Sequence, residues 1–97
     1  MKVNYAGCAI CDSTWGDTWE TIDGDRFFFC CPICAIQFQQ VVRRVKEATG
    51  WAKIDSLEIA GDRRGRTVRV AAGDLAALFE VAFNSDGELR TFRPATG

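Results

Sequence analysis

The pattern of apolar and polar positions is clearest between residues 32 and 50. One stripe of apolar residues recurs there at three- and four-residue spacing, and it consists of Phe38, Val41, Val42 and Val45. Such spacing predicts an amphipathic helix. Pro32 suits the first helical position, Cys31 precedes it where an N-cap belongs, and Gly50 is typical of a helix stop. We therefore expect one main helix between Cys31 and Gly50.

A hairpin is expected before this helix. Asp23 and Gly24 form a turn signal that leads into the aromatic run 27–29. Because the side chains of a strand alternate between its faces, Phe28 should lie on the opposite face from its two neighbours. One face of this strand is then apolar and exposed, which suits a subunit that packs against a larger protein.

Four strands are expected after the helix. Apolar residues alternate with polar ones at 57–59 and at 68–70, which predicts two antiparallel strands joined by a loop. Residues 75–83 fit both a helical stripe and strand alternation. We favour a strand, because the turn-rich cluster 84–87 and the following segment 89–92 complete a hairpin with it.

These elements predict an α+β fold in which a helix packs on an antiparallel sheet. The 97 residues, 47% of them hydrophobic, suffice for one modest core. We expect a single domain over 1–97, with the cysteine turns, hairpin and helix in 1–50 and the antiparallel strands in 51–97. The sequence shows neither a membrane-spanning apolar run nor a signal-peptide pattern, so a cytoplasmic location is expected.

Charge argues against nucleic acid as the default partner. The net charge is −1, and residues 1–26 carry five acidic side chains against Lys2 and Arg26. Basic residues are concentrated in one loop, which contains Arg63, Arg64 and Arg66. We favour a solvated hairpin tip for this loop over an RNA-binding role.

The three tryptophans, Trp15, Trp19 and Trp51, are expected to be core residues that cover the metal site and sheet rather than a partner-binding surface.

Five cysteines and the absence of histidine predict an all-thiolate metal site. Cytosolic thiols are kept reduced, and an odd number cannot all pair as disulfides. Cys8 and Cys11 form one tight turn with knuckle spacing, which is followed by polar residues rather than by the helix of a redox motif. Cys34 pairs with either Cys30 or Cys31, of which we favour Cys30. Zinc is the expected ion, although iron uses the same ligands.

The stretch 28–38, preceded by a Cys-x-x-Cys turn, resembles the treble-clef zinc modules called TRASH and YHS domains. Their pattern has an aromatic residue, Cys, usually Ser, two variable residues, Cys, three more and Phe. The resemblance covers about residues 5–45 and implies that Cys30 and Cys34 bind zinc while Cys31 caps the helix. It implies a treble-clef-like zinc finger, and settings in monooxygenase hydroxylase components and in metal handling. The second half of the chain departs from these short modules.

The whole chain is also similar to an archaeal family of small metal-binding proteins, on the Thr-Trp-Gly stretch after the first turn and the Thr-Gly-Trp stretch after the helix. Because no catalytic group is recognisable, we expect a non-enzyme that acts on no small-molecule substrate. The predicted role is an accessory subunit or interaction module of a larger protein complex. The alternatives are metal trafficking or sensing, with Cys31 as a reserve ligand, and an RNA- or ribosome-associated zinc protein.

Overall fold

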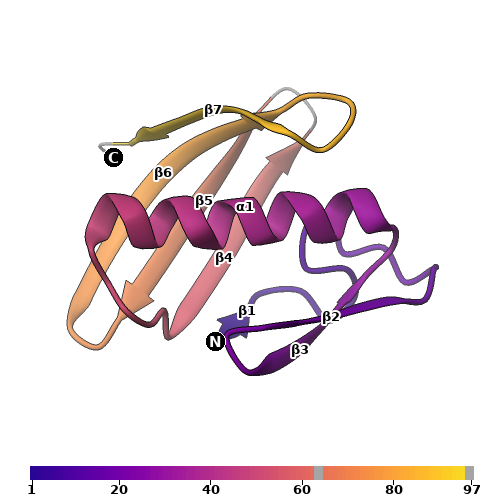
Figure 1. Ribbon diagram of the computed structural model, residues 1–97, viewed down its shortest axis with the longest axis horizontal. Coiled ribbons are helices and arrows are strands. Elements are labelled where there is room, and N and C mark those ends of the chain that lie inside the picture. The colour runs from indigo at the N-terminus through magenta and orange to yellow at the C-terminus, as the bar shows by residue number, and fades with distance from the viewer. Residues whose placement is uncertain (63–64, 96–97) are drawn as a thin grey trace.

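A single helix crosses one face of a five-stranded sheet, and a two-stranded hairpin lies beside that helix (Figure 1). This arrangement comes from a computed structural model, which describes residues 1–62 and 65–95. The elements are β1 (Lys2–Val3), β2 (Thr18–Ile22), β3 (Asp25–Phe29), α1 (Pro32–Thr49), β4 (Ser56–Asp62), β5 (Gly65–Ala72), β6 (Leu75–Phe83) and β7 (Leu89–Pro94). The predicted α+β class is confirmed.

The ends of α1 lie where the sequence predicted them. Cys31 is the N-cap residue with extended backbone angles, and Pro32 follows it as the first helical residue. Gly50 takes the left-handed conformation, with φ of 75°, and its N–H donates to the Lys46 carbonyl at 2.8 Å. Only glycine adopts this conformation without a Cβ penalty, so the helix ends here. The buried face consists of Ala35, Phe38, Val41, Val42 and Val45.

The predicted hairpin is strands β2 and β3. Asp23 and Gly24 both have positive φ, 55° and 83°, which is the geometry of the tight turn that suits twisted strands. Phe27 and Phe29 point inward, where their rings lie 5.2 and 5.4 Å from the ring of Phe38. Phe28, which lies between them, is partly exposed, and this confirms its predicted outward position.

The large sheet has the order β1-β4-β5-β6-β7. Its four C-terminal strands are antiparallel, and residues 75–83 form strand β6 as predicted. The sequence analysis missed β1, which pairs in parallel with β4 and makes the sheet mixed. Two residues are too few to show alternation. The Asn4 side chain continues this edge, because it both donates to and accepts from the backbone of Ile59.

One apolar core joins the helix, the hairpin and the sheet. Fully buried side chains from β4 and β5 face α1, and the same cluster reaches residues of the first cysteine turn. The sheet contributes Leu57, Ile59, Val68, Val70, Phe79 and Val81. Residues 1–50 and 51–97 therefore share their main hydrophobic contacts.

The prediction that the tryptophans are core residues is wrong for two of them. Trp15 is 63% exposed and Trp19 is 49% exposed, whereas Trp51 packs partly buried against the core. Trp15 lies in the loop before β2, and the ring of Trp19 packs against Phe28 on the outer side of the hairpin. Within residues 1–62 and 65–95, the structure contains no helix with the length and hydropathy needed to cross a lipid bilayer.

Candidate metal centre

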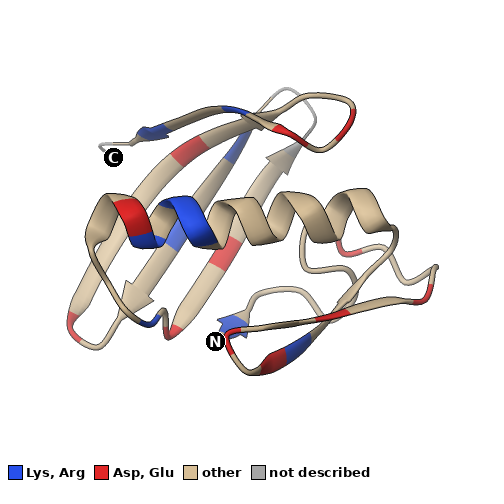
Figure 2. Ribbon diagram, in the orientation of Figure 1, with Lys and Arg blue, Asp and Glu red and all other residues tan. Residues whose placement is uncertain are grey.

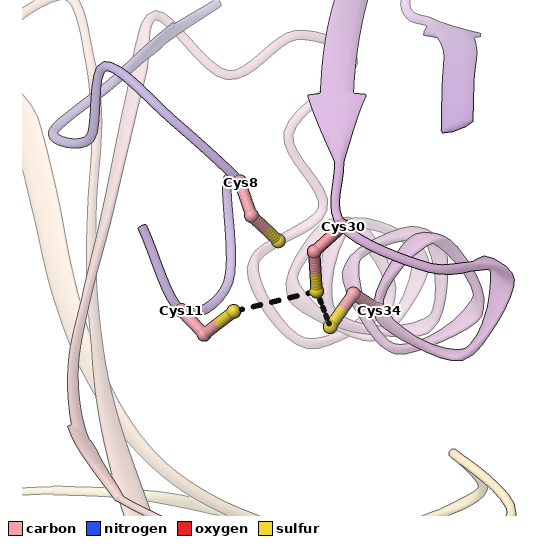
Figure 3. A group of neighbouring side chains, drawn as sticks. All are labelled: Cys8, Cys11, Cys30 and Cys34. Atoms are coloured by element: carbon pink, nitrogen blue, oxygen red, sulfur yellow. Dashed lines mark hydrogen bonds between the residues drawn. The ribbon is translucent and has the colours of Figure 1, made fainter. Parts of the chain in front are cut away.

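Four cysteine side chains converge on one point between the first turn of α1 and the loop that precedes the hairpin (Figure 3). The Sγ atoms of Cys8, Cys11, Cys30 and Cys34 all lie within 4.8 Å of one another. The Sγ atom of Cys30 is 3.5 Å from those of both Cys11 and Cys34. A tetrahedral ion with Zn–S bonds of about 2.3 Å requires sulfur separations of about 3.8 Å. The cluster therefore fits a single tetrahedrally bound ion.

The first cysteine pair is held by a tight backbone turn. The Asp12 N–H donates to the Cys8 carbonyl at 2.8 Å, and the Cys8 N–H donates to the Ser13 carbonyl at 2.9 Å. Asp12 has a φ of 61°, and its carboxylate accepts from the N–H of Gly7 at 2.9 Å. A Cβ on Gly7 would lie 2.7 Å from two carbonyl oxygens of this turn. These contacts close the turn and direct both sulfurs to the same side.

The second pair joins a strand end to a helix start. Cys30 directly follows β3, and Cys34 lies in the first turn of α1 (Figure 3). Gly16 packs on the backbone of Cys30: its φ is 96°, and a Cβ there would lie 2.2 Å from the Cys30 carbonyl oxygen. The sequence analysis did not assign roles to Gly7 and Gly16. Glycines beside a cysteine turn were the available signal, since close backbone approach requires them.

Cys31 lies next to the cluster but outside it. Its Sγ is 3.9 Å from that of Cys30, and the four-sulfur group contains Cys30 instead. The side chain of Cys31 makes no capping hydrogen bond, although the nearby N–H of Cys34 lowers the pKa of its thiol. The geometry thus favours the predicted set with Cys30. That these four sulfurs bind metal stays a prediction.

The thiols in the cluster strongly affect each other's ionisation. A hydrogen bond from Cys34 lowers the pKa of Cys8 to about 4, against the opposing effect of burial, and the backbone N–H groups of Cys30, Cys11 and Ile10 add to the lowering. The pKa of Cys34 is raised because its thiol donates this bond, and burial raises the pKa of Cys30 to about 12. Further thiolates in this space need a cation to offset their repulsion.

The site is enclosed on one side and open on the other. Cys8 and Cys30 are buried, Cys34 is partly buried, and Cys11 is exposed with its Sγ 3.1 Å from the Ser13 hydroxyl. Catalytic zinc sites keep one coordination position for water or substrate, whereas structural sites fill all four with protein ligands. Four converging thiols correspond to the structural kind.

The basic loop does not form one patch in the described structure. Arg63 and Arg64 lie outside the described residues, so the RNA-binding alternative stays a prediction. Arg66 and Arg69 lie on opposite faces of β5, since side chains alternate along a strand and two residues lie between them. The Nη1 atom of Arg66 lies 3.4 Å from the carbonyl oxygen of Ile10, inside the first cysteine turn. Sequence reasoning gave no sign of this contact, which joins residues 56 positions apart.

Comparison with curated proteins and with solved structures finds no match. A scan of known protein families matches residues 5–95 to the family described as Ta0938. This match includes all five cysteines and every element from β2 to β7. It names neither TRASH nor YHS domains, so that finer resemblance stays a prediction. Because the match covers nearly the whole length, the chain belongs to the Ta0938 family, a small archaeal protein family.

Proposed function

We propose that this protein is a small, non-catalytic zinc-binding module that docks onto a larger protein as an accessory subunit. The observation that carries the proposal is the exposure of Trp15 and Trp19, at 63% and 49%, in the chain segment between the two cysteine pairs of the four-cysteine cluster. A folded domain gains from burying tryptophan, and exposed tryptophans are enriched at interaction hot spots. The TRASH and YHS resemblance suggests a hydroxylase component of a multicomponent monooxygenase as one such partner.

Zinc is the proposed ion because it favours tetrahedral, all-sulfur, structural sites. The four cysteines lie in a loop, at the end of a strand and at the start of a helix. No continuous helix or strand connects these three places. A bound ion would therefore cross-link the segment that carries Trp15 and Trp19 to α1. Iron uses the same ligand type, and metal analysis of the purified protein distinguishes the two ions.

The exposed ring of Trp19 has contacts on its edge and on its face. The ring of Trp19 packs edge-on against Phe28 at 5.3 Å, and the guanidinium of Arg26 lies 4.7 Å from the same ring on its face. A side chain that is ordered before binding loses less entropy when a partner covers it. Ile33 and Ile36 are also exposed, at 42% and 46%, on the first turns of α1.

The charge around the hairpin indicates the chemistry of the partner. Acidic side chains are spread along the loop before β2 and along both hairpin strands (Figure 2). They are Asp12, Asp17, Glu20, Asp23 and Asp25. A tetrathiolate zinc centre would add further negative charge. We therefore expect the partner to present an apolar hollow bordered by Lys and Arg, which would also speed association at low salt.

The test is native mass spectrometry of the tagged protein purified from its own cell extract. We expect one zinc and one larger protein in fixed stoichiometry, with the complex weakened by salt. The Trp15→Ala/Trp19→Ala variant should keep its zinc and lose the partner. Leu75→Ala is the matched control, because Leu75 is 57% exposed at the start of β6 and is predicted to lie away from the interface. A zinc-loaded monomer, or equal loss of the partner in the control, contradicts the proposal.

Metal transfer is a second candidate function, favoured by the position of Cys31. Its sulfur lies 3.9 Å from that of Cys30, close enough to replace a ligand during exchange, and the exposed Cys11 gives an acceptor access to the centre. Transfer of zinc to a weak chelator within minutes, slowed in Cys31→Ser, would support this function. Zinc that stays bound for hours would contradict it.

A further inference from the structure

A cavity of about 400 Å³ opens between α1, the start of β5 and the end of β6. Its polar lining comes from Gln37, Arg66, Asn84 and Ser85, and its apolar wall includes Val81 and Phe83. Small-molecule sites have volumes of about 300–1,000 Å³, with apolar walls and a few converging polar groups. The size and lining of this cavity are of that kind.

The chemistry of the cavity is set by Arg66, the one charged side chain among the described residues that line it. Its Nη1 atom lies 3.4 Å from the carbonyl oxygens of Ile10 and Gly61. These contacts are longer than a typical N–H···O distance, so the guanidinium keeps donors for a stronger acceptor. Its planar fork matches two oxygens of a carboxylate or phosphate. Neutral donors from Gln37, Asn84 and Ser85 surround the same space.

The rim of the cavity is formed before any ligand arrives. The amide of Gln40 donates to the Gly87 carbonyl at 2.9 Å and accepts from the Leu89 N–H at 2.8 Å, which ties the β6–β7 loop to α1. Within that loop the Gly87 N–H donates to the Asn84 carbonyl at 3.0 Å. The loop therefore holds Asn84 and Ser85 opposite the helix, and little ordering entropy is lost on binding.

Two residues that line the cavity, Arg66 and Gln37, lie close to the segments that carry the cysteines. Arg66 reaches the carbonyl of Ile10, which lies between Cys8 and Cys11 in the first turn. Gln37 follows Cys34 by one helical turn on α1. A ligand that draws the guanidinium away from Ile10 changes the support of the first turn. By linkage, an effect of the ligand on metal affinity implies an equal effect of metal on ligand affinity.

We propose that this cavity binds a small molecule carrying a carboxylate or phosphate group on Arg66, and that its occupancy is coupled to the neighbouring metal centre. The binding rests on the cavity alone. The coupling rests in addition on the proposed metal centre.

Binding is tested by NMR titration of the ¹⁵N-labelled, zinc-loaded full chain with inorganic phosphate and, separately, with succinate, at constant ionic strength maintained with chloride. We expect saturable shifts of the Gln37, Asn84 and Ser85 amides with one of these probes, and the better probe identifies the class of oxyanion. Arg66→Gln should weaken binding at least tenfold. Arg69→Gln is the matched control, because it removes the same charge from the opposite face of the same strand.

Shifts that never saturate, or equal affinities in Arg66→Gln and the wild type, overturn the binding proposal. The amide spectrum of Arg66→Gln shows whether that variant is folded, and Arg66→Lys, which keeps the charge without the fork, should retain part of the affinity.

Coupling is tested by the rate of zinc release to a chelator, with and without the saturating probe. We expect at least a twofold change in the wild type and none in Arg66→Gln. An unchanged rate overturns the coupling. A protein that binds the probe but copurifies with no metal refutes the metal centre and leaves the cavity site intact, so the two failures are distinguishable.

Discussion

Cys30 and Cys31 are adjacent thiols, and the structure gives them different roles. The Cys30 side chain lies in the four-sulfur cluster, whereas that of Cys31 lies at the helix N-cap, outside the cluster. Replacing each in turn by serine makes the same chemical change at neighbouring positions. The Cys30→Ser and Cys31→Ser variants therefore test the ligand assignment directly, each serving as the control for the other.

The losses of folding free energy expected for the two variants differ by far more than experimental error. Structural zinc contributes about 10–16 kcal/mol of apparent folding free energy in small zinc domains, which is as large as the whole net stability of about 5–15 kcal/mol of a typical domain. Cys30→Ser should therefore leave at least residues 1–31 unfolded. Cys31 makes no capping hydrogen bond, and serine is a preferred N-cap residue. Cys31→Ser should change the free energy of unfolding by less than about 1 kcal/mol.

The assay combines zinc stoichiometry from native mass spectrometry with thermal unfolding followed by circular dichroism. Cys31→Ser should retain one zinc, and its melting temperature should stay within about 4–8 °C of the wild type, the shift that corresponds to 1 kcal/mol in a domain of this size. Cys30→Ser should bind zinc substoichiometrically, and its melting temperature should fall by clearly more than this range. Loss of zinc from Cys31→Ser together with full occupancy in Cys30→Ser would refute the ligand assignment.

Three further predictions concern the packing around the centre. Gly16→Ala should lower the free energy of unfolding in urea by about 1–3 kcal/mol more than Gly24→Ala does. Both positions have positive φ, but only Gly16 lies against a backbone carbonyl. Equal effects of the two substitutions would contradict this. Phe38→Ala, at a fully buried site, should cost about 3–5 kcal/mol in the same assay, and a loss below 1 kcal/mol would contradict the packing. Asn4→Ala should cost about 1–3 kcal/mol and speed amide hydrogen exchange at Ile59, whose backbone it bonds; unchanged exchange would contradict that role.

Local signals account for what the sequence predicted well. Pro32 and Gly50 limit the helix through their own backbone preferences, and Asp23 with Gly24 forms the hairpin turn for the same reason. Each of the two cysteine pairs likewise lies within one short segment of the chain. In each case the residues that determine the geometry are neighbours in the chain, so a single sequence contains the information.

Contacts between distant residues account for what it missed. β1 is a strand only because β4 lies beside it, and Asn4 extends that pairing through a side chain. The exposure of Trp19 depends on which side of the hairpin the core occupies, and hydrophobicity alone does not give that side. The cavity around Arg66 depends on β5 beginning beside the first cysteine turn.

The proposed metal centre has unequal importance for the two halves of the molecule. Helix α1 buries Val41 and Val45 in one core with a sheet whose strands pair through their own backbones, so this half has apolar packing besides the cysteines. The loop from the first cysteine turn to β2 contains no regular secondary structure, and Trp15 lies within it. Loss of metal should therefore release the loop first and with it the exposed aromatic surface, while the helix and sheet keep their apolar contacts. Partner binding would then depend on metal more steeply than the fold itself does.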